Sequence, residues 1–448
     1  MTDDSRRTGM PAKPITGGLP ALWLAGLFVL GSILLMDAAA PLLHAPPMHR
    51  LLRYWLHHRA DHDSWFPMIL AYAWLQEPHT GTLYQGLFFS EHVKFQYPPT
   101  ALLPLAAIEA LGRWPSEKVF NSINWFVFAF TVLAAGAFAL VAARRAEAIP
   151  VQARLASASV AVVAALATAA FFPLIRSYVL GQAQTAIDLA FALACLCWLC
   201  DRRLAAGILI GAICLVKPQF ALLLLWGGFR RQWPFLIGWC IVALPALALS
   251  IALFGITNHL DYLEELRFIS SHGETYYPNQ SMNGLLNRMV MNGDSLVWSE
   301  GNFAPYHPLV HLGGLLTSAI LILAALFLRG RRPDRGGLLD FMTATLTFTM
   351  ASPVAWEHHY GILPPILIAL LFALLTAPAA GRTVWLWVAL AAAYVASANF
   401  FPIANLAAAS WFNFVQSYLF FAALAVLWLL YRVEAPDWLR RQSLGARS

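Results

Sequence analysis

Residues 204–231 read LAAGILIGAICLVKPQFALLLLWGGFRR, two apolar runs that are separated by Lys217 and Pro218 and followed by Arg230 and Arg231. Each run is shorter than the ~20 residues that an α-helix needs to cross a bilayer. One straight span would place the two arginines opposite most other basic residues, although cytoplasmic loops normally collect Lys and Arg. We therefore predict a tight hairpin that bends at Lys217-Pro218, partway into the membrane.

The composition of the whole chain is typical of a membrane protein. Of its 448 residues, 59% are hydrophobic and 12% are charged, whereas soluble domains carry about 25% charged residues. Apolar stretches of nearly bilayer-spanning length recur throughout and leave no room for an ordinary soluble domain. We predict an all-α polytopic membrane protein with about twelve transmembrane helices, at 20–43, 118–143, 152–173, 183–200, 204–216, 218–229, 234–256, 309–328, 338–351, 361–377, 382–398 and 411–431.

This topology gives one membrane domain, 20–431, between cytoplasmic tails at 1–19 and 432–448. The first apolar run is longer than a signal-peptide core and lacks a small-residue cleavage site, so we expect an uncleaved helix. With the N-terminus in the cytoplasm, 19 of the 29 Lys and Arg residues fall on the cytoplasmic side, as the positive-inside rule requires. The net charge of +6 therefore reflects cytoplasmic loops, and no nucleic-acid partner is expected.

Two long loops lie outside under this topology, at about 44–117 and 257–308. Residues 98–112 of the first loop are apolar, but Glu109, Pro104 and the short length favour a helix at the outer interface over a span. The first outer loop is therefore expected to carry two or more interfacial helices.

The five cysteines indicate no disulfide framework, because all of them fall inside apolar spans. Cys197-x-x-Cys200 has the spacing of redox or metal-binding motifs. Buried thiols within a helix explain this pair better.

Five polar clusters fall on the outer side, and random loop polarity would not collect so many atypical residues on one face. A carboxylate beside two adjacent histidines at a membrane boundary is costly unless these groups bind something. We therefore predict one site at the membrane surface. Its clusters are Asp61-His62-Asp63 with Phe95-Gln96-Tyr97-Pro98-Pro99, Arg176 with Gly181-Gln182-Ala183-Gln184, Lys217-Pro218, Asn279-Gln280-Ser281-Met282-Asn283-Gly284, and Ser352-Pro353-Val354-Ala355-Trp356-Glu357-His358-His359-Tyr360.

The first cluster offers a general base. A carboxylate at Asp61 or Asp63 would take the proton of an acceptor hydroxyl while its oxygen attacks. Alternatively, Asp63 caps the helix that starts near Trp65. A metal site made of Asp61, His62 and Asp63 is disfavoured, because three consecutive side chains rarely point at one ion.

Polar groups also lie within or between the apolar spans. Gln184 and Asp188 are four residues apart and share one helix face. An aspartate in a span is a functional candidate, although a hydrogen-bonded bracket between helices explains Asp188 better. Lys217, at the hairpin tip, would reach a phosphate as a point charge, or would snorkel to the membrane surface.

The remaining clusters carry groups suited to a phosphorylated or sugar ligand. His358 and His359 supply donors for phosphate oxygens or sugar hydroxyls, and Glu357 is placed to orient one of them. Asn279-Gln280-Ser281 fits the N-glycosylation pattern, but sugar binding or loop ordering explains its amides better. Tyr97-Pro98-Pro99 stiffens the entry to the interfacial helix and would shape the rim of a cavity.

In their order along the chain, these motifs resemble glycosyltransferase family 87. Its members are GT-C membrane enzymes, among them polyprenyl-phosphate-mannose mannosyltransferases and arabinofuranosyltransferases. The shared patterns are an aspartate ahead of an aromatic helix, then F-x-Y-P-P, G-Q-x-(N/Q), K-P, N-Q-S-x-x-G and S-P-x-x-W-(D/E)-H-H, over about residues 60–365. Two positions depart from the family pattern: Gln184 stands where asparagine is usual, and Glu357 stands where aspartate is common.

The resemblance implies a GT-C fold and an inverting transfer of a mannose or arabinofuranose-like sugar. The donor would be a polyprenyl-phosphate sugar, and the acceptor a hydroxyl of a lipid or glycan on the extracytoplasmic face of a bacterial inner membrane. No cofactor or metal ion is required. Asp63 matches the family's base, with Asp61 as the alternative, and His358 and His359 match the histidine pair at the donor phosphate or sugar. The other site candidates are Lys217, Gln182, Glu357 and Asn279, followed by Arg176, Gln184 and Tyr97.

Two other functions fit parts of this pattern. A transporter or flippase of lipid-linked sugars would place its site near the bilayer midplane between symmetric halves. Here the polar motifs cluster at one face, and no halves match. A ligase of lipid-linked sugars also has many spans and a large outer loop, but the ordered motifs favour glycosyl transfer. The expected partners are the lipid-linked donor, the acceptor and membrane lipids.

Overall fold

The computed structural model describes residues 18–149, 153–299, 301, 303–329, 335–377 and 383–440, which form a helical bundle without a β-strand in these ranges. The first half contains α1 (Gly18–Ala39), α2 (Met48–Leu56), α3 (Trp65–Gln76), η1 (Tyr84–Ser90), η2 (Pro99–Leu102), α4 (Leu103–Ala110), α5 (Glu117–Arg145), α6 (Arg154–Ala169), α7 (Phe172–Val179), α8 (Gln184–Leu199), α9 (Arg203–Cys214), η3 (Pro218–Ala221) and α10 (Leu222–Phe229). The second half contains α11 (Trp233–Phe254), α12 (Ile256–His272), α13 (Met282–Met289), α14 (Pro308–Leu323), η4 (Ala324–Leu328), α15 (Leu338–Met350), η6 (Glu357–Ile362), α16 (Leu363–Thr376), α17 (Val384–Ala398), η8 (Pro402–Ala407), η9 (Asn413–Ser417), α18 (Tyr418–Arg432) and α19 (Asp437–Arg440).

Six helical segments in the described ranges are long and apolar enough to cross a membrane. A seventh candidate is the pair α6 and α7, which is bent by 55° at the break between them. The other predicted spans correspond to shorter apolar helices. The all-α membrane fold is therefore confirmed, while the count of twelve spans stays a prediction. The six segments are Pro20–Ala39, Glu117–Arg145, Trp233–Phe254, Pro308–Leu328, Glu357–Thr376 and Asn413–Arg432.

The stretch 204–229 is broken where the sequence predicted a bend. α9 ends at Cys214, and α10 begins only at Leu222. Lys217 lies in the break, and Pro218 takes the first position of the η3 turn. A proline is tolerated there because its fixed φ suits a helix start and its missing N–H would be unpaired in any case.

The two arms of this hairpin return to the same end of the bundle. The ring of Trp198 lies 4.0 Å from the Arg203 guanidinium at the start of α9 and 5.5 Å from the Trp226 ring near the end of α10. α9 packs closely on α11, since a Cβ at Gly207 would lie only 2.0 Å from the carbonyl oxygen of Phe235. The predicted hairpin is therefore present, and its tip points into the protein.

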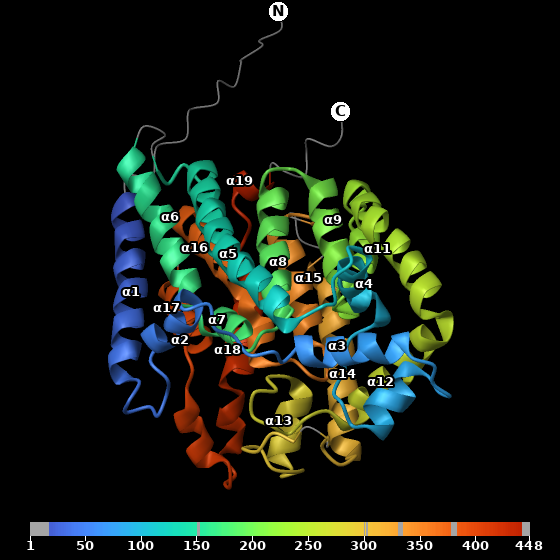
Figure 1. Ribbon diagram of the computed structural model, residues 1–448. Helices are drawn as coiled ribbons and strands as arrows, with labels where there is room; N and C mark the ends of the chain where they lie inside the picture. Colours follow the sequence, from blue (N-terminus) through green and yellow to red (C-terminus); the bar gives the residue numbers. More distant parts are fainter. Residues whose placement is uncertain are drawn as a thin grey trace, which may run out of the picture.

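The two long loops that were predicted to lie outside contain further helices, most of them at one end of the bundle. α2, α3, α12 and α13 lie in the lower half of Figure 1, away from α19. α4 has eight residues, or about 12 Å of helix, too short to cross a bilayer; its place at the membrane interface stays a prediction. The loops are joined because Asp261 of α12 accepts bonds from the Thr82 hydroxyl and, at 3.1 Å, from the N–H groups of Tyr84 and Gln85.

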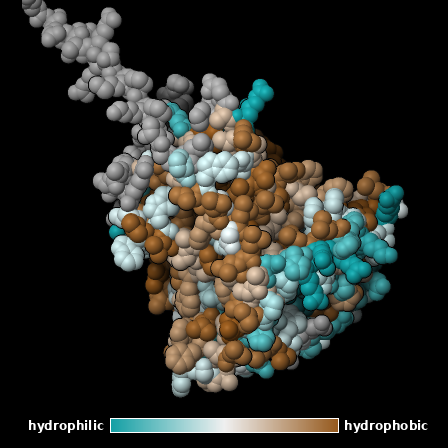
Figure 2. All heavy atoms as spheres, turned by 90° about the vertical axis from the view of Figure 1, so that its left-hand side faces the viewer, coloured by the Kyte–Doolittle hydropathy of each residue, from teal (hydrophilic) through white to brown (hydrophobic). Residues whose placement is uncertain are grey.

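The outer surface of the bundle is strongly apolar. α1 exposes Leu24, Leu27, Leu34 and Leu35. Figure 2 shows hydrophobic residues over most of the face on this side, with hydrophilic residues gathered toward one edge. Soluble proteins rarely expose contiguous apolar surface of this extent, so this surface is suited to lipid.

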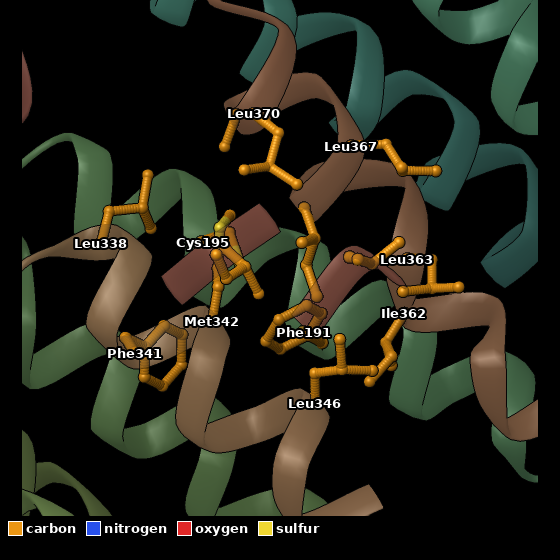
Figure 3. Close-up of a cluster of buried hydrophobic side chains, with 14 of the residues drawn as sticks. Phe191, Cys195, Leu338, Phe341, Met342, Leu346, Ile362, Leu363, Leu367 and Leu370 are labelled. Atoms are coloured by element: carbon orange, nitrogen blue, oxygen red, sulfur yellow. The ribbon is translucent and has the colours of Figure 1, made fainter. Parts of the chain in front are cut away.

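An apolar core between α8, α15 and α16 supports the segment that carries the histidine pair. Figure 3 shows Phe191 and Cys195 of α8 beside Met342 and Leu346 of α15 and Ile362 at the end of η6. η6 also packs against α7 and α8. This core fixes the position of η6 relative to the α7–α8 turn.

A buried ion pair closes the end of α10. Arg230 Nε donates to Asp340 at 2.7 Å, and the other guanidinium nitrogens donate to the carbonyl oxygens of Leu326 and Ala325 at 2.7 and 2.9 Å. Both charged side chains are almost inaccessible to solvent. Four of the five guanidinium N–H groups donate to protein oxygens in this arrangement.

The predicted tails are only partly described, because residues 1–17 and 441–448 lie outside the described ranges. All five cysteines are free, and Cys195 and Cys214 are buried as expected. Cys200 is exposed, so the buried-thiol prediction is wrong for this residue. α8 ends one residue earlier, at Leu199, and the chain turns toward the surface.

Candidate active site

The backbone around Asp63 is tied to the turn between α7 and α8. The Asp63 N–H donates to the carbonyl oxygen of Leu180 at 3.0 Å. Two residues earlier, the Asp61 N–H donates to Val179 at 2.8 Å. Gly181 has a φ of +67°, and a Cβ on it would lie 2.0 Å from the Asp61 carbonyl oxygen. A side chain at position 181 would therefore push the aspartate segment away.

Gln182 connects Asp63 to the polar groups behind it. Its Nε2 donates to the Asp63 carboxylate, while its Oε1 accepts from Ser64 Oγ at 2.7 Å and from Tyr97 Oη at 3.2 Å. Asn124 of α5 donates to the Gln182 carbonyl oxygen at 3.0 Å. Gln182 was expected to bind the sugar donor. In the structure it is a buried residue that positions Asp63.

The surroundings of Asp63 raise the pKa of its carboxyl above the ordinary value. Nearby protein atoms displace water from the carboxylate, and this desolvation is the largest contribution to the raised pKa. The hydrogen bond from Gln182 and the positive charge of Arg176 act in the opposite direction, while the negative charge of Asp61 adds to the increase. A raised pKa makes the ionised carboxylate a better proton acceptor.

Asp63 does not cap the helix that follows it. α3 begins at Trp65, and Ser64 occupies the N-cap position without a side-chain capping bond. The Asp63 carboxylate is held by Gln182 instead. Asp61 and Asp63 are both exposed, but the Asp61 segment is held through its carbonyl oxygen, which accepts from Asn121 Nδ2 at 3.0 Å. The capping alternative is therefore wrong, and Asp63 is the aspartate that joins the polar network.

Glu357 pairs with Arg176 and with neither histidine. The Arg176 Nε donates to Glu357 Oε1 at 3.2 Å; the glutamate is buried and the arginine is partly exposed. The expectation that Glu357 orients His358 or His359 is wrong, because its carboxylate turns toward α7. Arg176 also acts electrostatically on Asp63, so it links Asp63 to the histidine segment.

Lys217 contacts the histidine pair from the tip of the hairpin. Its Nζ lies 2.5 Å from Nε2 of His359. When Lys217 is an ammonium group it donates to Nε2, and the proton of the neutral imidazole then sits on Nδ1. The Nδ1 atom is buried without a hydrogen-bond partner among the described residues, and so is Nε2 of the neighbouring His358. Buried polar atoms without partners are typical of a site that binds a ligand.

Gln184 and Asp188 form the predicted contact along α8. Gln184 Nε2 donates to Asp188 Oδ1 at 2.8 Å, and both side chains are buried. Gly361 lies against the carboxylate, since a Cβ there would come within 2.2 Å of Asp188 Oδ2. The positive charge of Lys217 acts on Asp188. Asp188 thus lies within electrostatic range of Lys217, next to the segment that carries the histidine pair.

Asn279 orders the second of the two long loops and does not face open space. Its side chain is fully buried, with Nδ2 donating to the Glu274 carbonyl oxygen at 2.9 Å and Oδ1 accepting from the Ala355 N–H at 3.0 Å. Asn279 also forms an antiparallel bridge with Trp356. The sequence left sugar binding and loop ordering open for this amide. The geometry fits loop ordering, because both ends of the amide are hydrogen-bonded to backbone atoms. The residue positions the segment that carries the histidines.

Two members of this network were not anticipated from the motifs. Asn124 could have been noticed as an amide inside the 29-residue helix α5, since such groups in apolar spans need a partner. Ser64 carries no signal apart from its place beside Asp63. In the described parts of the chain, no group of three or more His, Cys, Asp and Glu side chains is arranged to hold a metal ion.

Comparison with known proteins identifies related sequences but no related structure. The model of glycosyltransferase family 87 matches residues 95–353, which is more than half of the chain. A curated protein of Mycolicibacterium smegmatis, named polyprenol-phosphate-mannose-dependent alpha-(1-2)-phosphatidylinositol pentamannoside mannosyltransferase, is 26% identical over 223 residues. The matched region is 49% of this chain and 50% of that protein, so the chain spans about half the length of this curated relative. No solved structure matches the chain significantly.

Proposed function

Because the chain belongs to glycosyltransferase family 87, as its motifs predicted, we propose that it transfers a sugar from a polyprenyl-phosphate donor to an acceptor hydroxyl. The sugar is mannose or a similar residue, and the acceptor is a lipid or glycan. Transfer inverts the anomeric centre and takes place on the extracytoplasmic face of a bacterial inner membrane. The observation that carries this proposal is that Arg176 acts on Asp63 and pairs with Glu357, which directly precedes the histidine pair that Lys217 contacts.

Asp63 acts as the general base. Its carboxylate takes the proton of the acceptor hydroxyl while the acceptor oxygen bonds to the anomeric carbon. The hydrogen bond from Gln182 holds the carboxylate in one orientation, and the raised pKa increases its basicity. Asp63 is left protonated and returns its proton to water.

Lys217, His359 and His358 assist departure of the polyprenyl phosphate. The bond between the anomeric carbon and the phosphate oxygen breaks, and its electron pair leaves with the phosphate. Positive charge from Lys217 and the Nδ1–H donor of His359 stabilise the charge that develops on this leaving group. Attack on the face opposite to the phosphate inverts the configuration.

An apolar groove supports the choice of a lipid-linked donor. The groove has a volume of about 480 Å³ and lies between α1, α6, α16 and α17. Its lining includes Phe171, one residue before the α7 helix that carries Arg176, and Pro364, five residues after His359. An isoprenoid chain in this groove would have its phosphate close to the histidine segment.

The test is a transfer assay with the purified protein in lipid vesicles. A panel of radiolabelled polyprenyl-phosphate sugars is supplied, and the movement of label from the lipid to an acceptor is followed. Asp63→Asn is expected to lower transfer by about 10²–10⁴-fold, while the protein level and membrane insertion stay normal. Asp61→Asn is the matched control and keeps most activity. Full activity of Asp63→Asn would contradict the assignment of the base.

The same vesicles distinguish the transferase from a flippase. A transferase breaks the sugar–phosphate bond and leaves free polyprenyl phosphate, whereas a flippase moves the intact donor to the other leaflet. The configuration of the new bond, read by NMR or by linkage-specific glycosidases, checks inversion. Movement of intact donor without bond cleavage, or retention of configuration, would overturn the corresponding part of the proposal.

A further inference from the structure

Three aromatic side chains form a partly exposed surface beside the histidine segment. The ring centroids of Tyr276 and Trp298 are 5.7 Å apart, those of Trp298 and Trp356 are 5.3 Å apart, and those of Tyr276 and Trp356 are 6.5 Å apart. Trp298 is 38% exposed, and the other two are half-buried. We call these three residues the aromatic platform. None of them has a role in the reaction described above.

The platform is held rigidly by both outer loops. Trp356 lies in the antiparallel bridge with Asn279, and the Glu357 N–H donates to the Pro278 carbonyl oxygen at 2.9 Å. Trp298 is held from the first outer loop, where the ammonium of Lys94 lies 3.9 Å from its ring centroid. A cation over an aromatic face is a favourable contact. Fixed rings of this kind lose little entropy when they bind a ligand.

An ion pair between the loops holds Lys94 in place. Its Nζ lies 2.5 Å from Glu274 Oε1, and both side chains are largely buried. The same ammonium lies 4.3 Å from the ring of Phe303. The orientation of Trp298 therefore depends on residues from both outer loops.

The platform borders the catalytic groups. Trp356 directly precedes Glu357, whose carboxylate accepts from Arg176. The charge of Arg176 acts both on Tyr276 and on Asp63. The aromatic surface and the base are therefore neighbours of one arginine. A molecule bound to the platform would lie next to the carboxylate that receives the acceptor proton.

A membrane-interface belt is the other common reason for clustered Trp and Tyr residues. Belt residues lie singly along the lipid boundary with their rings toward lipid. In this cluster the rings pack against one another at interplanar angles of 48–71°. The ammonium group of Lys94 lies over the face of the Trp298 ring. These contacts are suited to a ligand with both apolar and polar surface.

We propose that the aromatic platform binds a sugar ring of the acceptor, so that the acceptor is a molecule already carrying a glycan. The C–H bonds of a pyranose ring carry partial positive charge and pack on the negative face of an aromatic ring, while its hydroxyls remain free for hydrogen bonds. This inference rests on the proposed function and adds the class of acceptor. It assigns Tyr276, Trp298 and Trp356 to acceptor recognition and leaves the donor to Lys217 and the histidines.

The test measures steady-state transfer with octyl mannoside and 1-octanol as acceptors. Wild type is expected to use octyl mannoside at a far lower KM than octanol. Trp298→Ala and Trp356→Ala are each expected to raise the KM for octyl mannoside about five- to tenfold. The donor KM and the slow hydrolysis of the donor in the absence of acceptor should stay unchanged. Trp298→Phe should restore most of the affinity, because a ring is retained.

Trp411→Ala is the matched control, because this tryptophan is 83% exposed and lies outside the platform. An unchanged acceptor KM in both platform variants would overturn the inference, and so would a rise in the donor KM alone. Equal effects of Trp411→Ala and Trp298→Ala on membrane insertion, without a change in KM, would indicate a belt. A wild-type protein that neither hydrolyses nor transfers the donor would overturn the proposed function itself, and the inference with it.

Discussion

Nζ of Lys217 lies 2.5 Å from Nε2 of His359, although the two residues are 142 positions apart in the chain. When Lys217 is an ammonium group, this contact places the imidazole proton on Nδ1, because an ammonium group cannot accept a hydrogen bond. The Nδ1–H of His359 is then a buried donor without a partner among the described residues. In the proposed reaction, this nitrogen would face a phosphate oxygen of the donor.

Lys217→Met should lower the rate of sugar transfer by about 10²–10³-fold, the loss typical when one preorganised group that stabilises developing charge is removed. The reason is that the phosphate loses a positive charge and His359 loses the donor that sets its tautomer. The rate is measured by single-turnover transfer from a radiolabelled donor. Lys118→Met is the matched control, since Lys118 is exposed on α5. A variant at Lys217 with the wild-type rate would exclude the lysine from the reaction.

The acid limb of the pH–rate profile should follow the ionisation of Asp63. Gln182→Leu removes a hydrogen bond that lowers the pKa of this carboxyl, so the pKa rises further. The base is then protonated at a higher pH, and activity is lost earlier as the solution is acidified. The measurement is kcat/KM for the acceptor as a function of pH, compared with wild type.

Asp61→Asn should move the same limb in the opposite direction. The negative charge of Asp61 raises the pKa of Asp63, so its removal lowers that pKa and extends activity to a lower pH. The opposite signs of these two shifts are hard to obtain by general damage to the site. A complete loss of activity in Asp61→Asn would identify Asp61 as the base in place of Asp63.

Part of this site could be predicted from the sequence, since local spacing and polarity carry the information. The contact between Gln184 and Asp188 follows from their spacing of four residues on one helix. The break at Lys217 follows from charge and length. The partners of Gln182 and Glu357 could not be predicted in this way. Asp63 is 119 residues from Gln182, and Arg176 is 181 residues from Glu357. Such pairs are set by how helices pack, and a motif read along the chain does not contain that packing.

Gly181→Ala should abolish most transfer activity. A Cβ at this position would lie 2.0 Å from the Asp61 carbonyl oxygen, and the φ of +67° is unfavourable for alanine. The aspartate segment must move away, and Asp63 then loses its alignment with Gln182. Activity per folded molecule is measured after size-exclusion chromatography. Gly31→Ala is the control, because no atom lies within 4 Å of the added methyl group; equal activity in both variants would contradict the close approach.

Arg230→Met should destabilise the protein without removing its catalytic groups. The substitution leaves the carboxylate of Asp340 buried without its cation, a change that typically costs about 3–5 kcal/mol. Thermal unfolding in detergent, followed by tryptophan fluorescence, should show a markedly lower midpoint than wild type. The transfer rate of the molecules that remain folded should be close to normal, because none of the groups assigned to the reaction belongs to this pair.

The double variant Arg230→Met/Asp340→Leu separates loss of the pair from loss of packing. Replacing both members of a buried ion pair with apolar side chains is often close to neutral. The double variant should therefore recover most of the stability that Arg230→Met loses, and Arg231→Gln, at an exposed neighbour, should have little effect. If the double variant is as unstable as the single one, the guanidinium bonds to Leu326 and Ala325 dominate over the charge of Asp340.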